Sequence, residues 1–286
     1  QGRFELPGPQ LSQGLAAMGQ AAGVAGEGLP GRESVAGRGP ATVIGAGIGS
    51  PGGAPLEADR SLLVVFGASG GTGLAIVEVA LQRGYAVRAF VRNKEKLGRE
   101  LGELAAHERL EVMHGDLEDL DAVKSAIKGA RAVISVAGAA PETAKGPMTA
   151  AVPAMVEGCR RHGVRKLIVQ AGALSAAPGE WLGLLSSARL SRNVVRWQIG
   201  SSVVDDNDRV LQYLYDEVRD LNWVASRPAF LEDGESVGTL CACLDTFRPA
   251  TIRYVDVADW TVEQVDSDRY VGKMPRLYYP PVKHPI

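Results

Sequence analysis

The 286-residue sequence has little cysteine, no long apolar run and almost no net charge. It has only three cysteines, Cys159, Cys241 and Cys243, and such a small, odd number does not suit a disulfide framework. This favours a reducing compartment. No apolar run approaches the ~18 residues that a membrane helix needs, so we expect no transmembrane segment. A formal net charge of −2 creates no overall basic field, which argues against binding to nucleic acid.

The cysteines also give little sign of a metal site. One residue separates Cys241 from Cys243, and Asp245 follows, but structural zinc usually needs a second pair of ligands, which the sequence lacks. We therefore expect no bound metal, and we interpret both cysteines as small buried apolar residues.

Residues 1–60 differ in composition from everything that follows. They hold 15 of the 35 glycines and 6 of the 16 prolines, and they show no sustained period of 2 or 3.6. Such a segment cannot bury enough apolar surface to offset the entropy cost of ordering, so we expect a low-complexity extension that orders only on a partner. The chain begins at Gln1 rather than Met, for which a removed organelle-targeting peptide is one explanation and a fragment another.

A glycine pattern inside this extension resembles a dinucleotide fingerprint but lacks its context. Residues 41–50 read Ala-Thr-Val-Ile-Gly-Ala-Gly-Ile-Gly-Ser, and Pro51 and Pro55 follow. The prolines prevent a helix from starting there. Without a helix N-terminus nothing receives a diphosphate, so we reject this segment as a cofactor site.

From Ser61 onward the sequence alternates between short apolar strands and amphipathic helices. The expected strands are Leu62–Phe66, Ala86–Val91, Leu110–His114, residues 132–136, Lys166–Gln170 and residues 223–226. The expected helices are residues 72–83, 94–106, 118–128, 148–161 and 209–221. This alternation predicts an α/β fold for residues 61–286, a Rossmann-like doubly wound parallel sheet covered on both faces.

One glycine-rich stretch has the context that a dinucleotide site requires, because it joins the first buried strand to the first helix. Gly67 permits the tight turn, Gly70 or Gly71 lets the backbone approach a diphosphate without a Cβ, and Gly73 allows close helix–strand packing. The N–H groups at the helix start supply the anion site. The cofactor-binding residues expected here are Gly67, Ser69, Gly70, Gly71, Thr72 and Gly73.

The end of the second strand indicates which dinucleotide binds. NAD-binding versions of this fold carry Asp or Glu there, which accepts a hydrogen bond from the ribose 2′-hydroxyl. Here the strand ends in Arg92-Asn93-Lys94, with no acid. A guanidinium binds a 2′-phosphate bidentately, so we predict NADP(H) with Arg92 as the phosphate ligand, assisted by Lys94 or Lys96. A solvated basic turn before a helix is the alternative.

These segments resemble the atypical short-chain dehydrogenase/reductases, in their NmrA-like, NAD(P)-binding branch. The resemblance spans residues 61–279 and includes Gly115-Asp116-Leu117 and Arg227-Pro228. It implies that the late segment 255–259 starts a helix, for which we expect Asp256 as the N-cap. It also implies further cofactor residues. Asp116 and Leu117 are expected at the adenine, and Ala137 and Gly138 along the cofactor. Pro228 and Phe230 are expected near the nicotinamide.

Catalytic members of that family use Tyr-x-x-x-Lys, in which the ammonium lowers the pKa of a tyrosine on the same helix face. The only match in this sequence is Tyr279 with Lys283, and two prolines between them prevent a helix. Tyr215 and Arg219 have the spacing, but arginine stays protonated and cannot relay a proton. The standard proton donor is therefore missing, and the sequence assigns no catalytic residue.

Residues 175–202 are rich in Trp, Leu and Arg. They are typical of a lid over an apolar pocket, of a docking surface or of an ordinary amphipathic helix. Together with residues 1–60 they form the candidate surface for protein partners.

Three functions follow from these patterns. The missing dyad favours a non-turnover or weakly catalytic NADP(H)-binding subunit or assembly factor of a larger complex. We expect this protein in a chloroplast or mitochondrion, with the cytoplasm as the alternative. The second is an NADPH-dependent reductase of a small organic carbonyl or alkene. The third is an NADP(H) redox-sensing regulator.

Overall fold

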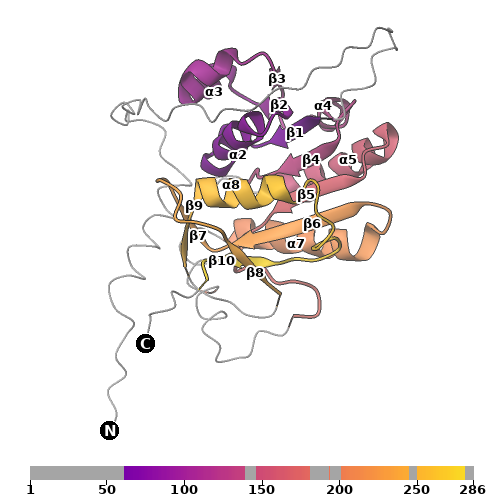
Figure 1. Ribbon diagram of the computed structural model, residues 1–286. Coiled ribbons are helices and arrows are strands. Elements are labelled where there is room, and N and C mark those ends of the chain that lie inside the picture. The colour runs from indigo at the N-terminus through magenta and orange to yellow at the C-terminus, as the bar shows by residue number, and fades with distance from the viewer. Residues whose placement is uncertain (1–60, 139–145, 181–192, 194–200, 245–249, 281–286) are drawn as a thin grey trace, which may run out of the picture.

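The computed structural model describes residues 61–138, 146–180, 193, 201–244 and 250–280. The predicted extension, with its rejected glycine pattern, lies outside the described residues, and so does most of the segment 175–202. Figure 1 shows a central sheet with helices packed against both of its faces.

The main sheet has the strand order β3-β2-β1-β4-β5-β6-β10-β8 among the described residues. Its first six strands are parallel in the 3-2-1-4-5-6 order of a doubly wound dinucleotide-binding fold, so the predicted fold class is confirmed. They are β1 (Leu62–Phe66), β2 (Ala86–Val91), β3 (Leu110–His114), β4 (Ala132–Ser135), β5 (Lys166–Gln170) and β6 (Asn222–Pro228).

Four short strands beyond β6 were not predicted. β10 (Arg276–Tyr278) extends the main sheet parallel to β6, and β8 (Cys241–Cys243) pairs antiparallel to β10. A separate parallel pair joins β7 (Phe230–Glu232) to β9 (Thr251–Arg253). Each has three residues, which is too short for an alternating pattern to mark it. The sequence predicts that Cys241 and Cys243 are buried, but both are only half-buried in β8.

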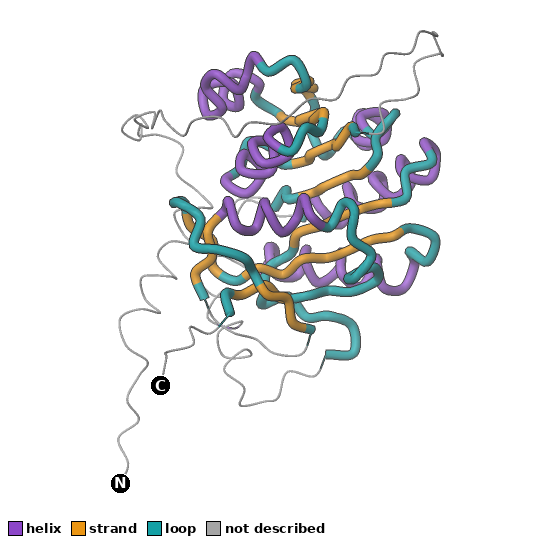
Figure 2. The backbone as a smooth tube through the Cα atoms, in the orientation of Figure 1, coloured by secondary structure: helices purple, strands orange, loops and turns teal. Residues whose placement is uncertain are grey.

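Two groups of helices cover the two faces of the sheet (Figure 2). Side chains alternate along β1, where Val64 and Phe66 contact one group while Leu63 and Val65 contact the other. The first group comprises α4 (Leu120–Ala126), α5 (Pro147–His162) and α7 (Ser201–Glu217). The second comprises α2 (Gly71–Gln82), α3 (Lys94–Leu101) and α8 (Tyr254–Glu263).

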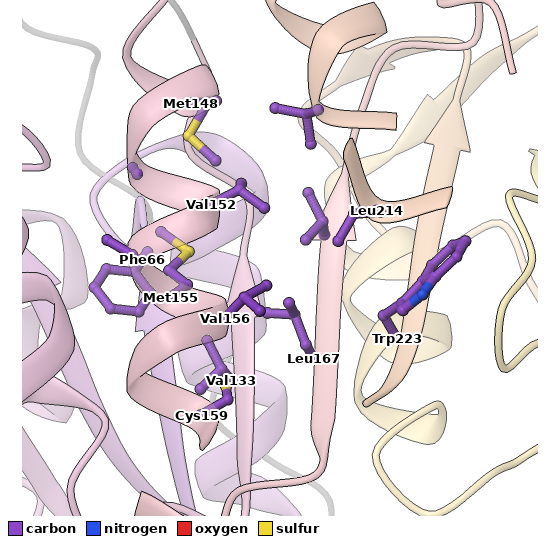
Figure 3. Packing of buried hydrophobic residues seen from close by; sticks show 14 of the residues in the cluster. Phe66, Val133, Met148, Val152, Met155, Val156, Cys159, Leu167, Leu214 and Trp223 are labelled. Carbon is purple, nitrogen blue, oxygen red and sulfur yellow. The ribbon is translucent and has the colours of Figure 1, made fainter. Parts of the chain in front are cut away.

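The core beneath α5 is filled by apolar side chains from α5 and the sheet (Figure 3). Met155 and Val156 of the helix lie against Val133 and Leu167 of the strands, and all four are buried. Cys159 belongs to this cluster, and burial raises the pKa of its thiol to about 12. The thiol is therefore un-ionised at neutral pH and packs as an apolar group.

All five predicted helices differ from their expected bounds, and the differences are largest for the helices expected at residues 94–106 and 209–221. The expected helix 94–106 is divided at Gly102, whose φ of +56° ends α3, and a short 3-10 helix, η1 (Gly102–Ala106), follows. A φ in this range suits glycine and breaks the α-helical hydrogen-bond ladder. The expected helix 209–221 begins earlier, at Ser201, and ends at Glu217 as α7.

Candidate cofactor site

The turn between β1 and α2 is packed tightly against the end of β4. Gly67 has a φ of +81°, and a Cβ at this position would lie 2.6 Å from the backbone nitrogen of Ala137. A Cβ at Gly73 would lie 2.1 Å from the carbonyl oxygen of Gly67. Real side chains do not tolerate such distances, so both positions require glycine. The turn therefore lies at the point where the strand order reverses between β1 and β4, which is where ligands bind in this class of sheet.

The start of α2 presents backbone donors to open space. Gly70 is the N-cap, with no side-chain hydrogen bond, and its N–H donates to the Gly67 carbonyl at 3.1 Å. The first intrahelical bond runs from the Leu74 N–H to the Gly70 carbonyl, so the N–H groups of the first turn have no partner within the helix. The nearest atom to a Cβ at Gly70 would be the Gly67 carbonyl oxygen, 3.5 Å away. Of the other predicted turn residues, Ser69 is half-buried and Thr72 is buried.

The end of β2 places Arg92, the predicted phosphate ligand, at the same edge of the sheet as the β1–α2 turn. Arg92 is exposed and follows buried Val91, which pairs with His114 of β3. Asn93 caps α3, because its side-chain oxygen accepts from the Lys96 N–H at 2.7 Å. No ion pair involves Arg92 among the described residues, which leaves its guanidinium available.

Asp116 and Leu117 follow β3. The exposed Asp116 carboxylate accepts from the Glu118 N–H at 2.9 Å, which fixes the turn that leads toward α4. Leu117 is half-buried and packs against the core. Both residues lie beyond the carboxyl end of β3, at the edge of the sheet that carries the β1–α2 turn.

The predicted residues after β4 and β6 lie at the same edge but differ in exposure. Ala137 is half-buried beside Gly67, and Gly138 is exposed with open space around it. Pro228, at the end of β6, is buried, and its carbonyl accepts from the Ala173 N–H at 2.9 Å. Phe230 is 7% exposed in β7, so only a small part of its ring is accessible.

Tyr279 is committed to a structural contact. Its hydroxyl donates to the Asp256 carboxylate at 2.5 Å and accepts from the Arg253 N–H at 3.1 Å. Burial, and then the hydrogen bond to Asp256, raise the pKa of Tyr279 to about 12. This is opposite to the lowering that a catalytic tyrosine needs. Its sequence partner Lys283 lies outside the described residues.

Tyr215, the other tyrosine with suitable spacing, lies on the surface. Tyr215 of α7 is 46% exposed, and the Arg219 guanidinium lies 5.4 Å from its ring centroid. At the start of the same helix, buried Asp206 accepts from the backbone N–H groups of Met148 and Thr149 at 3.2 and 2.8 Å. This carboxylate therefore caps α5 and stabilises its positive end.

The expectation that Asp256 is an N-cap is wrong. Arg253 is the N-cap of α8, and Asp256 lies inside its first turn. Its buried carboxylate accepts from Ser236 Oγ at 2.5 Å and from the Val237 N–H at 3.0 Å, in addition to Tyr279. Burial alone raises the pKa of Asp256, but these hydrogen bonds outweigh it, so the pKa lies below its usual value. The carboxylate thus ties the loop after β7 to the start of α8.

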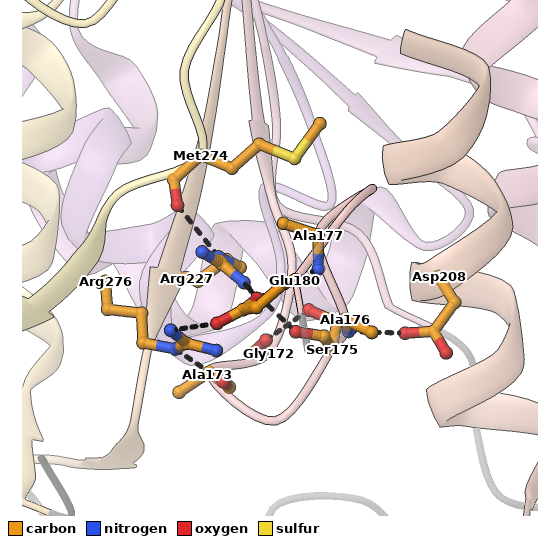
Figure 4. A network of polar contacts seen from close by, with 10 residues as sticks. All are labelled: Gly172, Ala173, Ser175, Ala176, Ala177, Glu180, Asp208, Arg227, Met274 and Arg276. Carbon is orange, nitrogen blue, oxygen red and sulfur yellow. Dashed lines mark hydrogen bonds and ion pairs between the residues drawn. The ribbon is translucent and has the colours of Figure 1, made fainter. Parts of the chain in front are cut away.

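A buried ionic network, which sequence reasoning missed, lies beside the end of β6 (Figure 4). Arg227 and Arg276 are 1% and 3% exposed, and both bind Glu180, at 2.8 and 2.5 Å. Arg227 also donates to the carbonyls of Met274 and Ser175. Burial raises the pKa of Glu180, but hydrogen bonds from the two guanidinium groups outweigh it and hold the pKa below its usual value. The network fastens the segment after β5 to β6 and β10.

Gln170, at the end of β5, is a further polar residue at the carboxyl edge of the sheet. Its side-chain oxygen is buried and has no hydrogen-bond partner among the described residues. Ser226 of β6 is paired with it in register, and its hydroxyl is in the same state. Elsewhere in the described ranges, His, Cys, Asp and Glu side chains form no group of three that suits a metal ion.

This geometry matches a known sequence family. The family model described as NAD(P)H-binding matches residues 67–268, which is more than half of the chain. The chain belongs to the NAD(P)H-binding family. The match starts at Gly67, the first residue of the β1–α2 turn, and the predicted resemblance to an NAD(P)-binding family is confirmed.

Individual relatives and solved structures agree with this assignment. Oxidoreductase AgnL4 from Paecilomyces divaricatus is 36% identical over 73 residues, which are 25% of this chain and 28% of that protein. The anaerobillin reductase ChuY from Escherichia coli O157:H7 superposes with a TM-score of 0.61 at 21% identity, over 78% of this chain and 100% of that one. A wide-type short-chain dehydrogenase/reductase from Veillonella parvula, solved with NADP, gives 0.61 at 17% identity, over 78% and 96%.

The similarity to AgnL4 is confined to less than a third of that protein, and the two structural similarities show the fold alone. The family model and the fold therefore show an NAD(P)H-binding domain of Rossmann type. Within the described ranges, none of the helices combines the length and the apolar character that a membrane span needs.

Proposed function

We propose that this protein binds NADP(H) at the carboxyl edge of its sheet, with the diphosphate on the β1–α2 turn. The observation that carries the proposal is the start of α2, where the first-turn N–H groups have no partner within the helix and a Cβ at Gly70 would lie near only the Gly67 carbonyl oxygen. A helix N-terminus of this kind attracts a diphosphate through its donors and its dipole. Gly67 and Gly73 hold the turn, and Ser69, Gly71 and Thr72 complete it.

The preference for NADP(H) over NAD(H) rests on the end of β2. Arg92 is exposed there without an ion-pair partner among the described residues, and no acid occupies the strand end. A carboxylate at this point repels a 2′-phosphate, whereas a guanidinium binds it. The adenine then falls near Asp116 and Leu117, and the cofactor runs past Ala137 and Gly138 toward Pro228 and Phe230.

A binding titration with NADPH and NADH tests the proposal. We expect NADPH to bind at least about tenfold more tightly, since a bidentate charged contact is worth about 1.5–3 kcal/mol. Arg92→Asp should remove this preference by weakening NADPH binding, and Arg99→Asp on the same helical region serves as a charge-matched control. Equal affinity of the wild-type protein for both nucleotides contradicts the assignment of Arg92.

We further propose that turnover is weak or absent. Tyr279 is held by Asp256, and the residues at the start of α7 include carboxylates that bond to backbone N–H groups. No Tyr-x-x-x-Lys spacing occurs among the described residues. A role as a subunit or assembly factor of an organellar complex, bound through residues 1–60 and 175–202, accords with such a site, and copurification with a large complex tests it.

An NADPH-dependent reductase of a small carbonyl or alkene is the second candidate. It is favoured by Gln170 at the end of β5, where the family that the sequence resembles often has serine, because the buried side-chain oxygen of Gln170 has no hydrogen-bond partner among the described residues. An amide binds a carbonyl but does not deliver a proton, so water or the substrate has to supply it. The test is oxidation of NADPH with a panel of carbonyl and alkene substrates. Activity that the wild type shows and that Gln170→Ala lacks supports this candidate over the first.

A further inference from the structure

The β1–α2 turn is unusually rich in glycine and needs support from outside. Four of the seven residues from Gly67 to Gly73 are glycine. Glycine loses more conformational freedom on ordering than any other residue, so a turn of this composition is poorly preorganised by itself. Affinity for a diphosphate depends on holding the first-turn N–H groups in one arrangement before the ligand arrives.

Backbone contacts hold three of these glycines. The Gly67 position abuts the backbone of Ala137, and the Gly73 position abuts the carbonyl of Gly67. Gly70 donates its N–H to that same carbonyl. Gly71 differs, because the three atoms nearest to a Cβ placed there all belong to the ring of Tyr254, at 2.5, 2.6 and 2.9 Å.

Tyr254 is itself held in place. It is the first residue of α8, the helix that packs beside α2 on the same face of the sheet. Its neighbour Arg253 donates its backbone N–H to Tyr279 and its guanidinium to the Asp233 carbonyl. Two residues further on, Asp256 fixes the start of α8 through Ser236, Val237 and Tyr279. The half-buried ring therefore stands on a braced helix end.

We propose that Tyr254 is a positioning residue for the diphosphate turn, because its ring, seated on Gly71, holds the first turn of α2 in the arrangement that receives the cofactor. This inference rests on the proposed function. It also separates the two exposed glycines: Gly70 faces open space on the ligand side, whereas Gly71 is glycine because the Tyr254 ring occupies the place of its side chain.

The first test uses two probes and two variants. NADPH carries a diphosphate, whereas adenosine 2′-monophosphate carries the adenine and the 2′-phosphate but no diphosphate. We expect Tyr254→Ala to weaken NADPH binding about tenfold through lost preorganisation and to leave the affinity for adenosine 2′-monophosphate unchanged. Tyr254→Phe, which keeps the ring, should bind NADPH as the wild type does.

A double-mutant cycle provides a second test, in which a general effect of Tyr254→Ala on binding is subtracted from the effect of the Gly71 methyl group. In Gly71→Ala the new methyl group must displace the Tyr254 ring, so NADPH binding weakens. In the Tyr254→Ala background the same methyl group meets no ring, so Gly71→Ala should add no further loss. Gly98→Ala in α3, where a Cβ has no neighbour, is the matched glycine control and should bind normally.

The outcomes separate the two levels of the argument. Wild-type protein that binds no NADPH defeats the proposed function and this inference with it. Wild-type binding that Tyr254→Ala leaves unchanged defeats the inference alone. Equal losses for NADPH and adenosine 2′-monophosphate, or additive losses in the cycle, also overturn it, because they indicate general damage or a direct clash of the Gly71 methyl group with the cofactor.

Discussion

The two ends of the carboxyl edge of the sheet are held together by different means. At the β1–β4 end, glycines allow backbone to lie directly against backbone, as Gly67 does beside Ala137. At the β6–β10 end, buried ion pairs join the segments, because Arg227 and Arg276 both bind Glu180. The first-turn N–H groups at the first end have no partner within α2, whereas the second end uses its donors within the protein.

This contrast explains why one end is visible in the sequence and the other is not. The glycines recur at fixed short spacings beside a strand and a helix, so local reading finds them. Arg227 and Glu180 are 47 positions apart, and no local pattern joins them. A change at Gly70, the glycine of the first end that has room for a side chain, should therefore affect binding with little loss of stability, and changes at the second end should do the reverse.

The largest effect is expected for Gly70→Glu. The new side chain occupies the open space in front of the first turn of α2 and places a negative charge where a diphosphate belongs, so NADPH binding should become undetectable by titration. Stability should change little, because a Cβ at this position meets only one atom. Gly98→Glu adds the same group to α3 and should bind NADPH normally. Retained binding in Gly70→Glu contradicts the placement of the diphosphate.

The next effect is a loss of stability in Arg227→Met. Removing one partner of a buried ionic network costs about 3–5 kcal/mol, and here it also leaves the carbonyls of Met274 and Ser175 without a donor. Denaturant unfolding at neutral pH measures this loss. Arg160→Met breaks an exposed pair with Asp220 and should cost about 1 kcal/mol or less. Similar losses in the two variants contradict the contrast between a buried and a surface network.

The smallest effect is a pH dependence carried by Tyr279. Its pKa is raised from 10.0 to about 12 in the folded protein, so the neutral phenol stabilises the fold fully below about pH 10. That stabilisation is lost as the pH rises toward 12. Tyr279→Phe should unfold more readily at pH 8 but lose less stability between pH 10 and 12, as measured by denaturant midpoints. Exposed Tyr215→Phe should follow the wild-type profile.

The fold was predictable to the extent that each element carries its own signal. β1, β2, β3 and β5 have the predicted bounds, because each is an apolar run between turns. The three-residue strands beyond β6 have no such run, and their pairing depends on chain segments that are distant in sequence.

The candidate site divides in the same way. The glycines of the turn, and Arg92 after β2, follow from local context, and the structure places them at one edge of the sheet. Asp256 was misread because the capping rule considers only neighbours along the chain, whereas its carboxylate bonds to Ser236 and Tyr279. The contact of Tyr254 with Gly71 joins the two ends of the domain, so no sequence window contains both residues.

The packing of α8 beside α2 has a consequence for how the protein is made. The glycine turn is synthesised well before the aromatic ring that rests on it, because Tyr254 belongs to α8, the last helix along the described part of the chain. A nascent chain that ends before this helix exposes the apolar stripe of α2 that Ala258 and Val262 later cover. The support of the glycine turn is therefore complete only once α8 has been synthesised and has packed beside α2.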